Sequence, residues 1–93
     1  MSTTPQEARR IAELMLREYS PGELLYQQRA AWLIRQEFGE QHVYRNRNGN
    51  FGINSIILAE FKRIRPADVV WSRRRQLWRK RREGDPATGI MVR

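Results

Sequence analysis

Pro66 divides the chain into two parts with different patterns of apolar residues. Before Pro66, apolar residues recur at the three- and four-residue spacing of amphipathic helices. After it, Val69-Val70-Trp71 is a run of β-branched and aromatic residues, which favours a strand. Proline cannot continue a helix and disfavours helical geometry at the residue before it. The sequence therefore predicts helices that end before Pro66 and a β-structure that follows it.

The first helix is predicted over Pro5–Tyr19, where apolar residues have helical spacing. Thr4 can cap this helix, and Glu7 is placed to hydrogen-bond back to the cap residue. Ser20-Pro21-Gly22 then ends it. Two interpretations of the next residues remain open, because the same polar residues could cap a second helix at once, or Leu24-Leu25-Tyr26 could form a short buried strand.

The second helix is predicted over Gln28–Phe38, with Gly39 at the position of a C-terminal glycine cap. Its apolar stripe is wide, which is typical of a central helix, and Trp32 within it is expected to lie in the core. The third helix is predicted over Asn54–Arg65, with Asn54 or Ser55 as its cap.

A hairpin is predicted around Asn48-Gly49, because both central positions of a type I′ turn need positive φ. Pairing around this turn places Tyr44 opposite Ile53 and Asn46 opposite Phe51. The asparagines of the segment are interpreted as turn formers rather than as ligand-binding residues, and they are Asn46, Asn48 and Asn50.

A second hairpin is predicted after Pro66, with Val69–Trp71 and Leu77–Arg81 as its strands. Trp71 then lies opposite Trp78, so that the two rings share one face as a cross-strand aromatic pair. The competing interpretation is a helix over residues 73–82 with Ser72 as its cap. The hairpin is favoured because residues 69–71 enter the segment as an extended chain.

This order of elements is similar to that of a winged helix, in which the third helix enters the major groove and the hairpin, or wing, contacts the DNA backbone or minor groove. The resemblance implies a small α+β, winged-helix-like domain with three helices, a hairpin around Asn48-Gly49 and a basic C-terminal hairpin. The domain is expected over residues 1–83, and residues 84–93 are expected to form a flexible tail. The insertion around Asn48-Gly49 departs from the ordinary winged helix, which has only a tight turn there.

A second resemblance rests on a sequence pattern between residues 24 and 82. The pattern consists of Phe38-Gly39-Glu40, Val43-Tyr44, Asn46, Asn48-Gly49-Asn50, Ile53, Val69-Val70-Trp71 and Trp78-Arg79. It resembles a family of short, functionally uncharacterised bacterial and phage-associated proteins. This resemblance implies one compact domain and brings no activity, cofactor or site residues with it.

The excess of positive over negative charge in the chain is confined to one segment. Residues 62–82 contain ten basic residues and one acidic residue, whereas residues 1–61 contain seven of each sign, and the whole chain has a net charge of +8. A solubilising surface usually mixes both signs, so a segment of one sign with tryptophans in it indicates a polyanionic partner. We therefore expect a nucleic-acid-binding protein, with duplex DNA as the leading partner.

Twelve residues are candidate nucleic-acid contacts. The arginines and lysines after Pro66 are expected to be exposed and to contact phosphates, which position a protein without reading sequence. Three residues of the third helix are candidates for contacts with bases. The phosphate-contacting candidates are Arg73, Arg74, Arg75, Arg79, Lys80, Arg81 and Arg82, the base-contacting candidates are Asn54, Ser55 and Arg63, and Lys62 and Arg65 complete the set.

The alternative function is a non-enzymatic protein-interaction module that docks on an acidic protein, with Tyr26 or Phe51 as an exposed anchor. A homodimer is compatible with both functions, and a membrane partner is not expected. Enzymatic chemistry, a metal and a cofactor are not expected either, because the chain has no cysteine and one histidine, His42, which is interpreted as a surface residue. The sequence has neither a signal peptide nor a transmembrane run, which favours a cytoplasmic protein.

Overall fold

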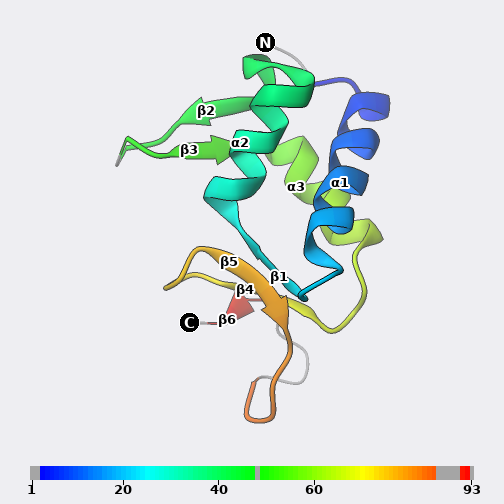
Figure 1. Cartoon of the computed structure of the whole chain (residues 1–93), viewed down its shortest axis with the longest axis vertical. Coiled ribbons are helices and arrows are strands. Elements are labelled where there is room, and N and C mark those ends of the chain that lie inside the picture. The colour runs from blue at the N-terminus through cyan, green and yellow to red at the C-terminus, as the bar shows by residue number, and fades with distance from the viewer. Residues whose placement is uncertain (1–2, 48, 86–90, 93) are drawn as a thin grey trace.

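The computed structural model of the chain describes residues 3–47, 49–85 and 91–92. In this part of the chain three α-helices and antiparallel strands form the predicted α+β fold, with the helices at one end of the molecule and the larger sheet at the other (Figure 1). The order of elements is α1 (Pro5–Tyr19), β1 (Leu24–Tyr26), α2 (Gln27–Phe38), the 3-10 helix η1 (Glu40–His42), β2 (Val43–Arg45), β3 (Phe51–Ile53), α3 (Ser55–Ile64), β4 (Val69–Ser72), β5 (Leu77–Lys80) and β6 (Met91–Val92).

Helix α1 has the bounds that the sequence predicts, because its N-terminal hydrogen bonds are satisfied by side chains. The Thr4 hydroxyl accepts from the Glu7 amide at 3.1 Å, and the Glu7 carboxylate accepts from the Thr4 amide at 2.9 Å. The apolar side of α1 packs along α3, which contributes the fully buried Ile57 and Phe61 to the core. This pair of helices forms one layer of the domain.

Residues 24–26 form a strand, which decides between the two interpretations of that segment. Leu25 is buried and pairs with Trp78 of β5, so β1 is an edge strand on the β4–β5 hairpin. The sheet has the order β1-β5-β4-β6, in which β6 runs parallel to β4 and the other neighbours are antiparallel. The helix–strand–helix–helix–hairpin order and the β1-β5-β4 sheet agree with the predicted winged-helix-like arrangement.

The β4–β5 hairpin, which we call the wing, confirms the predicted strand pairing. Trp71 lies opposite Trp78, and their ring centroids are 4.6 Å apart. The turn is closed by a hydrogen bond of 2.8 Å from the Gln76 amide to the Ser72 carbonyl, with Gln76 at a φ of 56°. The competing helix over residues 73–82 is therefore wrong.

The β2–β3 hairpin exists, but its predicted register is wrong by one residue. Val43 pairs with Ile53 and Arg45 pairs with Phe51. The Asn46 amide donates to the Asn50 carbonyl at 2.7 Å, so the loop that these two residues close is one residue longer than the predicted turn. Gly49 has a φ of 81°, which suits the last position of such a loop.

The asparagines that flank this loop are turn formers, as predicted. The Asn46 side-chain oxygen accepts from the Asn50 amide at 3.0 Å, which closes the loop a second time. Asn48 lies outside the described residues.

Trp32 lies on the surface with 49% of its area exposed, so its predicted place in the core is wrong. The buried residues of α2 are Ala30, Ala31, Leu33 and Ile34. At 100° per residue Trp32 points to the opposite side of the helix from the centre of this group. Its ring instead lies 5.4 Å from the guanidinium group of Arg29.

His42 is buried, with 1% of its area exposed, which contradicts the expected surface position. The chain before α1 folds over η1, and the Thr3 hydroxyl lies 2.9 Å from His42 Nδ1. The Phe38 ring and the imidazole meet edge to face, with ring centroids 6.3 Å apart. Because Thr3 and His42 are 39 positions apart, only the tertiary fold brings them together.

The C-terminal residues that the structure describes contact the wing. Met91 and Val92 pair with Trp71 and Ser72 of β4, a strand that the sequence does not predict. Residues 86–90 and 93 lie outside the described residues, and the domain boundary after residue 83 stays a prediction. None of the helices described here combines the length and the apolar character that a membrane span requires.

Candidate nucleic-acid interface

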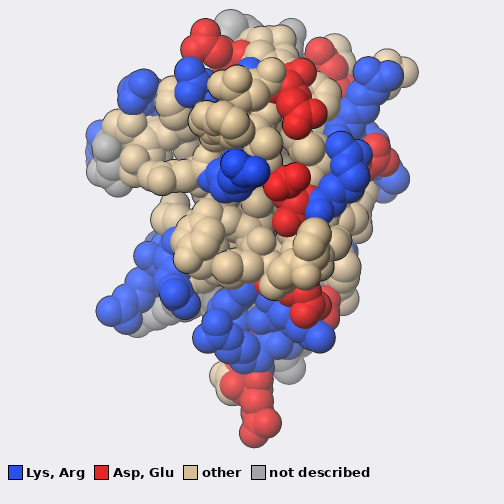
Figure 2. Space-filling model, viewed as in Figure 1, with Lys and Arg blue, Asp and Glu red and all other residues tan. Residues whose placement is uncertain are grey.

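A cleft lies along the wing, facing α3 on one side and the β2–β3 loop on the other, and it consists of two adjoining hollows. The first hollow has a volume of about 270 Å³ and is mainly apolar, and the second has a volume of about 500 Å³ and is mainly polar. Gln27, the first residue of α2, lines both hollows and so marks where they meet. Figure 2 shows the molecule hollowed on this side, between the two projecting hairpins.

The apolar hollow is built by α3 and the wing. Helix α3 and its C-cap contribute residues at helical spacing, and the wing contributes the two paired tryptophans. Phe61 and Trp78 are buried and meet edge to face with centroids 5.2 Å apart, whereas Trp71 is only partly buried. Besides Gln27, the lining residues are Leu58, Phe61, Lys62, Arg65, Trp71 and Trp78.

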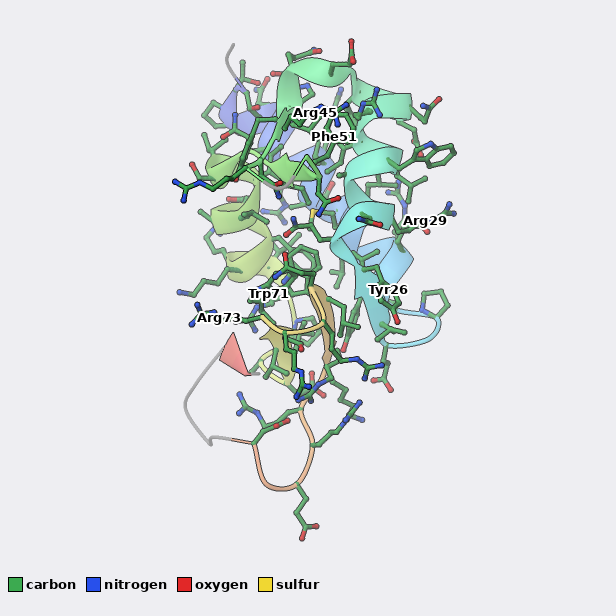
Figure 3. The ribbon with its side chains drawn as sticks, turned by 90° about the vertical axis from the view of Figure 1, so that its left-hand side faces the viewer. Tyr26, Arg29, Arg45, Phe51, Trp71 and Arg73 are labelled. Carbon is green, nitrogen blue, oxygen red and sulfur yellow. The ribbon has the colours of Figure 1, made fainter. Side chains whose placement is uncertain are left out.

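The polar hollow, which we call the arginine hollow, is lined by the wing turn and by segments from the first half of the chain. The turn contributes Arg73, Arg74, Arg75 and Gln76, and the remaining lining residues are Tyr26, Gln27, Gln28, Asn46 and Asn50. Figure 3 looks into the cleft, with Trp71 between the hairpins and with Arg73 and Tyr26 on opposite sides of it. Gln28 Nε2 donates to Asn50 Oδ1 at 3.3 Å, so α2 and the β2–β3 loop are joined there.

The three arginines of the wing turn are exposed, as predicted. Within residues 3–47, 49–85 and 91–92, none of the Arg73, Arg74 and Arg75 guanidinium groups makes an ion pair or a hydrogen bond. The backbone of the turn is held from inside, because the buried Ser72 hydroxyl accepts from the Arg75 amide at 3.3 Å and Gln76 Nε2 donates to the Arg73 carbonyl at 2.6 Å. The turn therefore presents three adjacent positive charges on a fixed backbone.

Arg79 differs from these arginines, and its predicted exposure is wrong. It is only 7% exposed, and its guanidinium group donates two hydrogen bonds to Asp85, at 2.9 and 3.1 Å. These bonds, together with one from the Arg82 amide, lower the pKa of Asp85 to about 2. The charge of Arg79 is neutralised inside the molecule because the chain after β5 turns back over it.

The other basic residues near the wing have different surroundings. Lys80 lies 3.7 Å from the Glu23 carboxylate, and Arg82 is exposed. Arg65 is partly buried at the edge of the apolar hollow, and burial together with the nearby charge of Arg81 lowers its pKa. Only Arg65 of these four lines the cleft.

The candidate base-contacting residues of α3 are mostly engaged within the protein. The Asn54 side chain caps α3 by accepting from the Ile56 amide at 3.2 Å, and it also donates to Thr3. Arg63 donates to Glu60 at 3.2 Å, and this bond lowers the pKa of the Glu60 carboxyl. Ser55 is exposed and lies on the same helical side as Leu58.

Of the twelve predicted contact residues, the structure brings five to the cleft, and these are Lys62, Arg65, Arg73, Arg74 and Arg75. Within the residues that the structure describes, no group of three histidine, aspartate or glutamate side chains is placed to hold a metal ion. The geometry can therefore present positive charge, side-chain amides and an apolar surface side by side to a ligand.

Comparison with known proteins identifies the family of the chain. The model of DUF6953, a family of unknown function, matches residues 7–80. The chain belongs to DUF6953. No curated protein and no solved structure matches the chain. The association with bacteria and phages that the sequence pattern implies stays a prediction.

The DUF6953 match includes every residue that lines the cleft, while Asp85 lies outside it. Sequence reasoning missed the contribution of Gln27, Gln28, Asn46 and Asn50 to the cleft. No signal along the chain places these residues opposite the wing turn, since at least 23 positions separate them from Arg73. Tyr26 is exposed, as expected of an anchor, but Phe51 is covered by the guanidinium groups of Arg35 and Arg45, which lie 4.1 and 4.6 Å from its ring centre.

Proposed function

We propose that this protein binds nucleic acid through the cleft, with the wing turn as its main phosphate contact. The observation that carries the proposal is the set of three exposed guanidinium groups of Arg73–Arg75, which make no ion pair within the described residues and line one hollow together. Guanidinium groups present a planar fork of donors that matches the oxygen atoms of a phosphate. An ordinary protein surface would pair such a cluster with carboxylates or spread it out.

The distribution of acidic residues supports the same proposal. Most ion pairs of the described residues join glutamates of α1, η1 and α3 to arginines away from the wing. The two others, Arg79–Asp85 and Lys80–Glu23, involve strand β5, and none of these pairs involves the wing turn. Figure 2 shows red and blue side chains mixed over α1, while in the lower part of the molecule, at the wing, blue side chains predominate and red ones lie beside and below them. A polyanion would therefore meet positive charge at the wing and mixed charge elsewhere.

The helix–wing frame suggests how a nucleic acid lies on the protein. Lys62 on α3 and the wing turn flank the apolar hollow, so a backbone that crosses the cleft passes two separate groups of cations. These contacts go to phosphates and do not depend on base sequence. Duplex DNA is the first ligand to test, and the biological role that we propose is that of a small accessory or regulatory protein.

The test is the salt dependence of binding, measured by fluorescence anisotropy with a labelled random duplex of about 20 base pairs and with one of its strands. Four neutralised phosphates predict a slope of log K against log salt near −3.6 for the duplex, at about −0.9 for each phosphate. The double variant Arg73→Ala/Arg75→Ala is expected to bind more weakly and to flatten this slope by about 1.8.

A matched control removes the same charge from another surface. The double variant Arg10→Ala/Arg17→Ala changes two exposed arginines of α1 and is expected to keep the slope of the unmodified protein within about 0.5. Equal slopes for the wing variant and the unmodified protein, with both folded by circular dichroism, would remove the wing from the interface. Absence of binding to duplex and single strand at low salt would overturn the proposal as a whole.

A second candidate function is docking on an acidic protein, and exposed apolar side chains on β1, next to the wing, and on α2 favour it. Leu24 and Tyr26 are 43% and 46% exposed, and Trp32 is 49% exposed. Such side chains are typical anchors of protein interfaces. Trp32→Gln is expected to weaken docking on a protein and to leave nucleic-acid binding unchanged, because Trp32 lies outside the cleft.

A further inference from the structure

We infer that the apolar hollow of the cleft takes one unpaired nucleobase, stacked on Trp71, while the neighbouring phosphates lie on the arginine hollow and on Lys62. This inference rests on the proposed nucleic-acid binding and specifies its substrate class. The substrate is a single strand, or a duplex with an overhang or an unpaired base. A base within an intact duplex is stacked on both sides and cannot enter a hollow unless it is first extruded.

The walls of the hollow suit a flat aromatic ligand. The Trp78 ring is buried and is held by Phe61 at 5.2 Å, and the Trp71 ring rests against Trp78 at 4.6 Å. Trp71 is therefore held in place by its contact with Trp78, and both residues line the hollow. A fixed aromatic side chain in a basic groove is the usual platform for bases of single-stranded nucleic acid, because every base has a π-face.

The polar atoms of the hollow suit the edge of a base. Gln27 lies where the two hollows meet, and its side-chain amide offers both a donor and an acceptor. Its backbone is fixed to the wing turn, since the Gln27 amide donates to the Gln76 carbonyl at 3.0 Å. Its side chain makes a hydrogen bond of 3.4 Å to the Phe51 carbonyl, which is long enough to be exchanged for a bond to a ligand.

The charges around the hollow select the ligand. Lys62 and Arg65 stand at its rim, and Arg73–Arg75 follow in the adjoining arginine hollow. An apolar peptide side chain would gain nothing from cations on two sides, and a fatty acyl chain carries an anionic group at one end only. An aromatic base joined to phosphates on both sides matches this order of positive, apolar and positive surface.

The experiment compares three labelled ligands with similar numbers of phosphates, which are a single strand of about 20 nucleotides, the same strand with abasic sites, and a blunt duplex of about ten base pairs. Trp71→Leu removes the aromatic ring and keeps an apolar side chain at that position. This variant is expected to bind the single strand about tenfold more weakly and to bind the abasic strand and the duplex with unchanged affinity. Trp71→Phe is expected to restore most of the loss, because the ring is what the base contacts.

Trp32→Leu is the matched control, since Trp32 is also partly exposed but lies outside the cleft. Binding of the single strand is expected to quench tryptophan fluorescence in this control and not in Trp71→Leu. The inference is overturned if Trp71→Leu weakens binding of all three ligands equally, or if it changes none of them. In either case the proposed nucleic-acid binding stands as long as the Arg73→Ala/Arg75→Ala variant binds these ligands more weakly than the unmodified protein does. If the unmodified protein binds none of the three ligands, both the proposed function and this inference are overturned.

Discussion

The carboxylate of Asp85 accepts two hydrogen bonds from the guanidinium group of Arg79, at 2.9 and 3.1 Å, beneath the surface of the wing. The Arg82 amide donates a third bond to the same carboxylate at 2.6 Å. The pair divides the basic segment into two kinds of residue. Arg79 helps to hold the chain that follows β5, and Arg73–Arg75 remain exposed.

The Arg79–Asp85 pair predicts a loss of stability in acid. Asp85 has its pKa lowered from 3.8 to about 2 by these bonds, so folding favours the ionised form. The stabilisation is fully present above pH 3.8 and is lost as the pH falls toward 2. Urea unfolding at several pH values is therefore expected to show Asp85→Asn less stable than the unmodified protein at pH 7, with a difference that shrinks between pH 4 and pH 2.

The control for the acid experiment is Glu83→Gln, which removes an exposed carboxylate two residues from Asp85. The Glu83→Gln variant is expected to have the same unfolding free energy as the unmodified protein at every pH. A difference between Asp85→Asn and the unmodified protein that stays constant down to pH 2 would contradict a role for the Asp85 charge.

Lys62 and Arg63 are neighbours in sequence and are predicted to differ in function. Lys62 lines the cleft, whereas Arg63 is hydrogen-bonded to Glu60 on another side of α3. Lys62→Ala is expected to reduce the salt slope of nucleic-acid binding by about 0.9, and Arg63→Ala is expected to leave it nearly unchanged. Anisotropy titrations at several salt concentrations measure both slopes. A larger change for Arg63→Ala than for Lys62→Ala would contradict this prediction, because it would place the nucleic acid on the side of α3 that carries Arg63.

Trp32 and Phe61 give opposite predictions for stability. Phe61 is 1% exposed and contacts Trp78, so Phe61→Ala is expected to cost about 3–5 kcal/mol of unfolding free energy. Trp32 is half-exposed on α2, so Trp32→Gln is expected to change that free energy by less than about 0.5 kcal/mol. Urea denaturation measures both values, and a cost for Trp32→Gln comparable to that of Phe61→Ala would mean that Trp32 is buried.

Tyr44 covers Gly52 across the β2–β3 hairpin. The two residues are paired, and a Cβ atom added to Gly52 would lie 2.5 Å from Tyr44 Cζ, so any other residue displaces the ring. Gly52→Ala is expected to destabilise the protein by about 1 kcal/mol. In a Tyr44→Ser background the same change is expected to cost at least about 0.5 kcal/mol less, because no ring remains to be displaced. Strictly additive effects in this double-mutant cycle would show that the ring does not rest on Gly52.

Local signals in the sequence were enough to predict most of the helices and strands. The capping box at Thr4 and Glu7 determines where α1 begins, and the apolar period and Pro66 determine where the later helix stops. The Trp71–Trp78 pairing follows from the β-type residues on both sides of a polar turn. These features depend on hydrogen bonds and packing between residues close in sequence, which is why a pattern read along the chain predicts them.

Register and burial depended on more distant contacts. The β2–β3 pairing differs by one residue because the loop that Asn46 and Asn50 close, with Gly49 in its last position, is one residue longer than the expected turn. Trp32 is exposed because α2 turns its small residues toward the core, and His42 is buried because Thr3 folds over it from the far end of the chain. The residues next to Trp32 and His42 in the sequence do not indicate that Trp32 is exposed or that His42 is buried.

The sequence by itself determined the α+β class, most of the elements and the concentration of positive charge after residue 61, because all three depend on residue order and type. Only the tertiary structure decided which of those charges are available to a ligand. Asp85 neutralises Arg79 and Glu60 engages Arg63, while the wing turn keeps Arg73–Arg75 exposed. The cleft itself joins residues from α2, the β2–β3 loop, α3 and the wing. Such a surface forms only when the chain folds, because its lining residues come from separate segments and no sequence pattern links those segments.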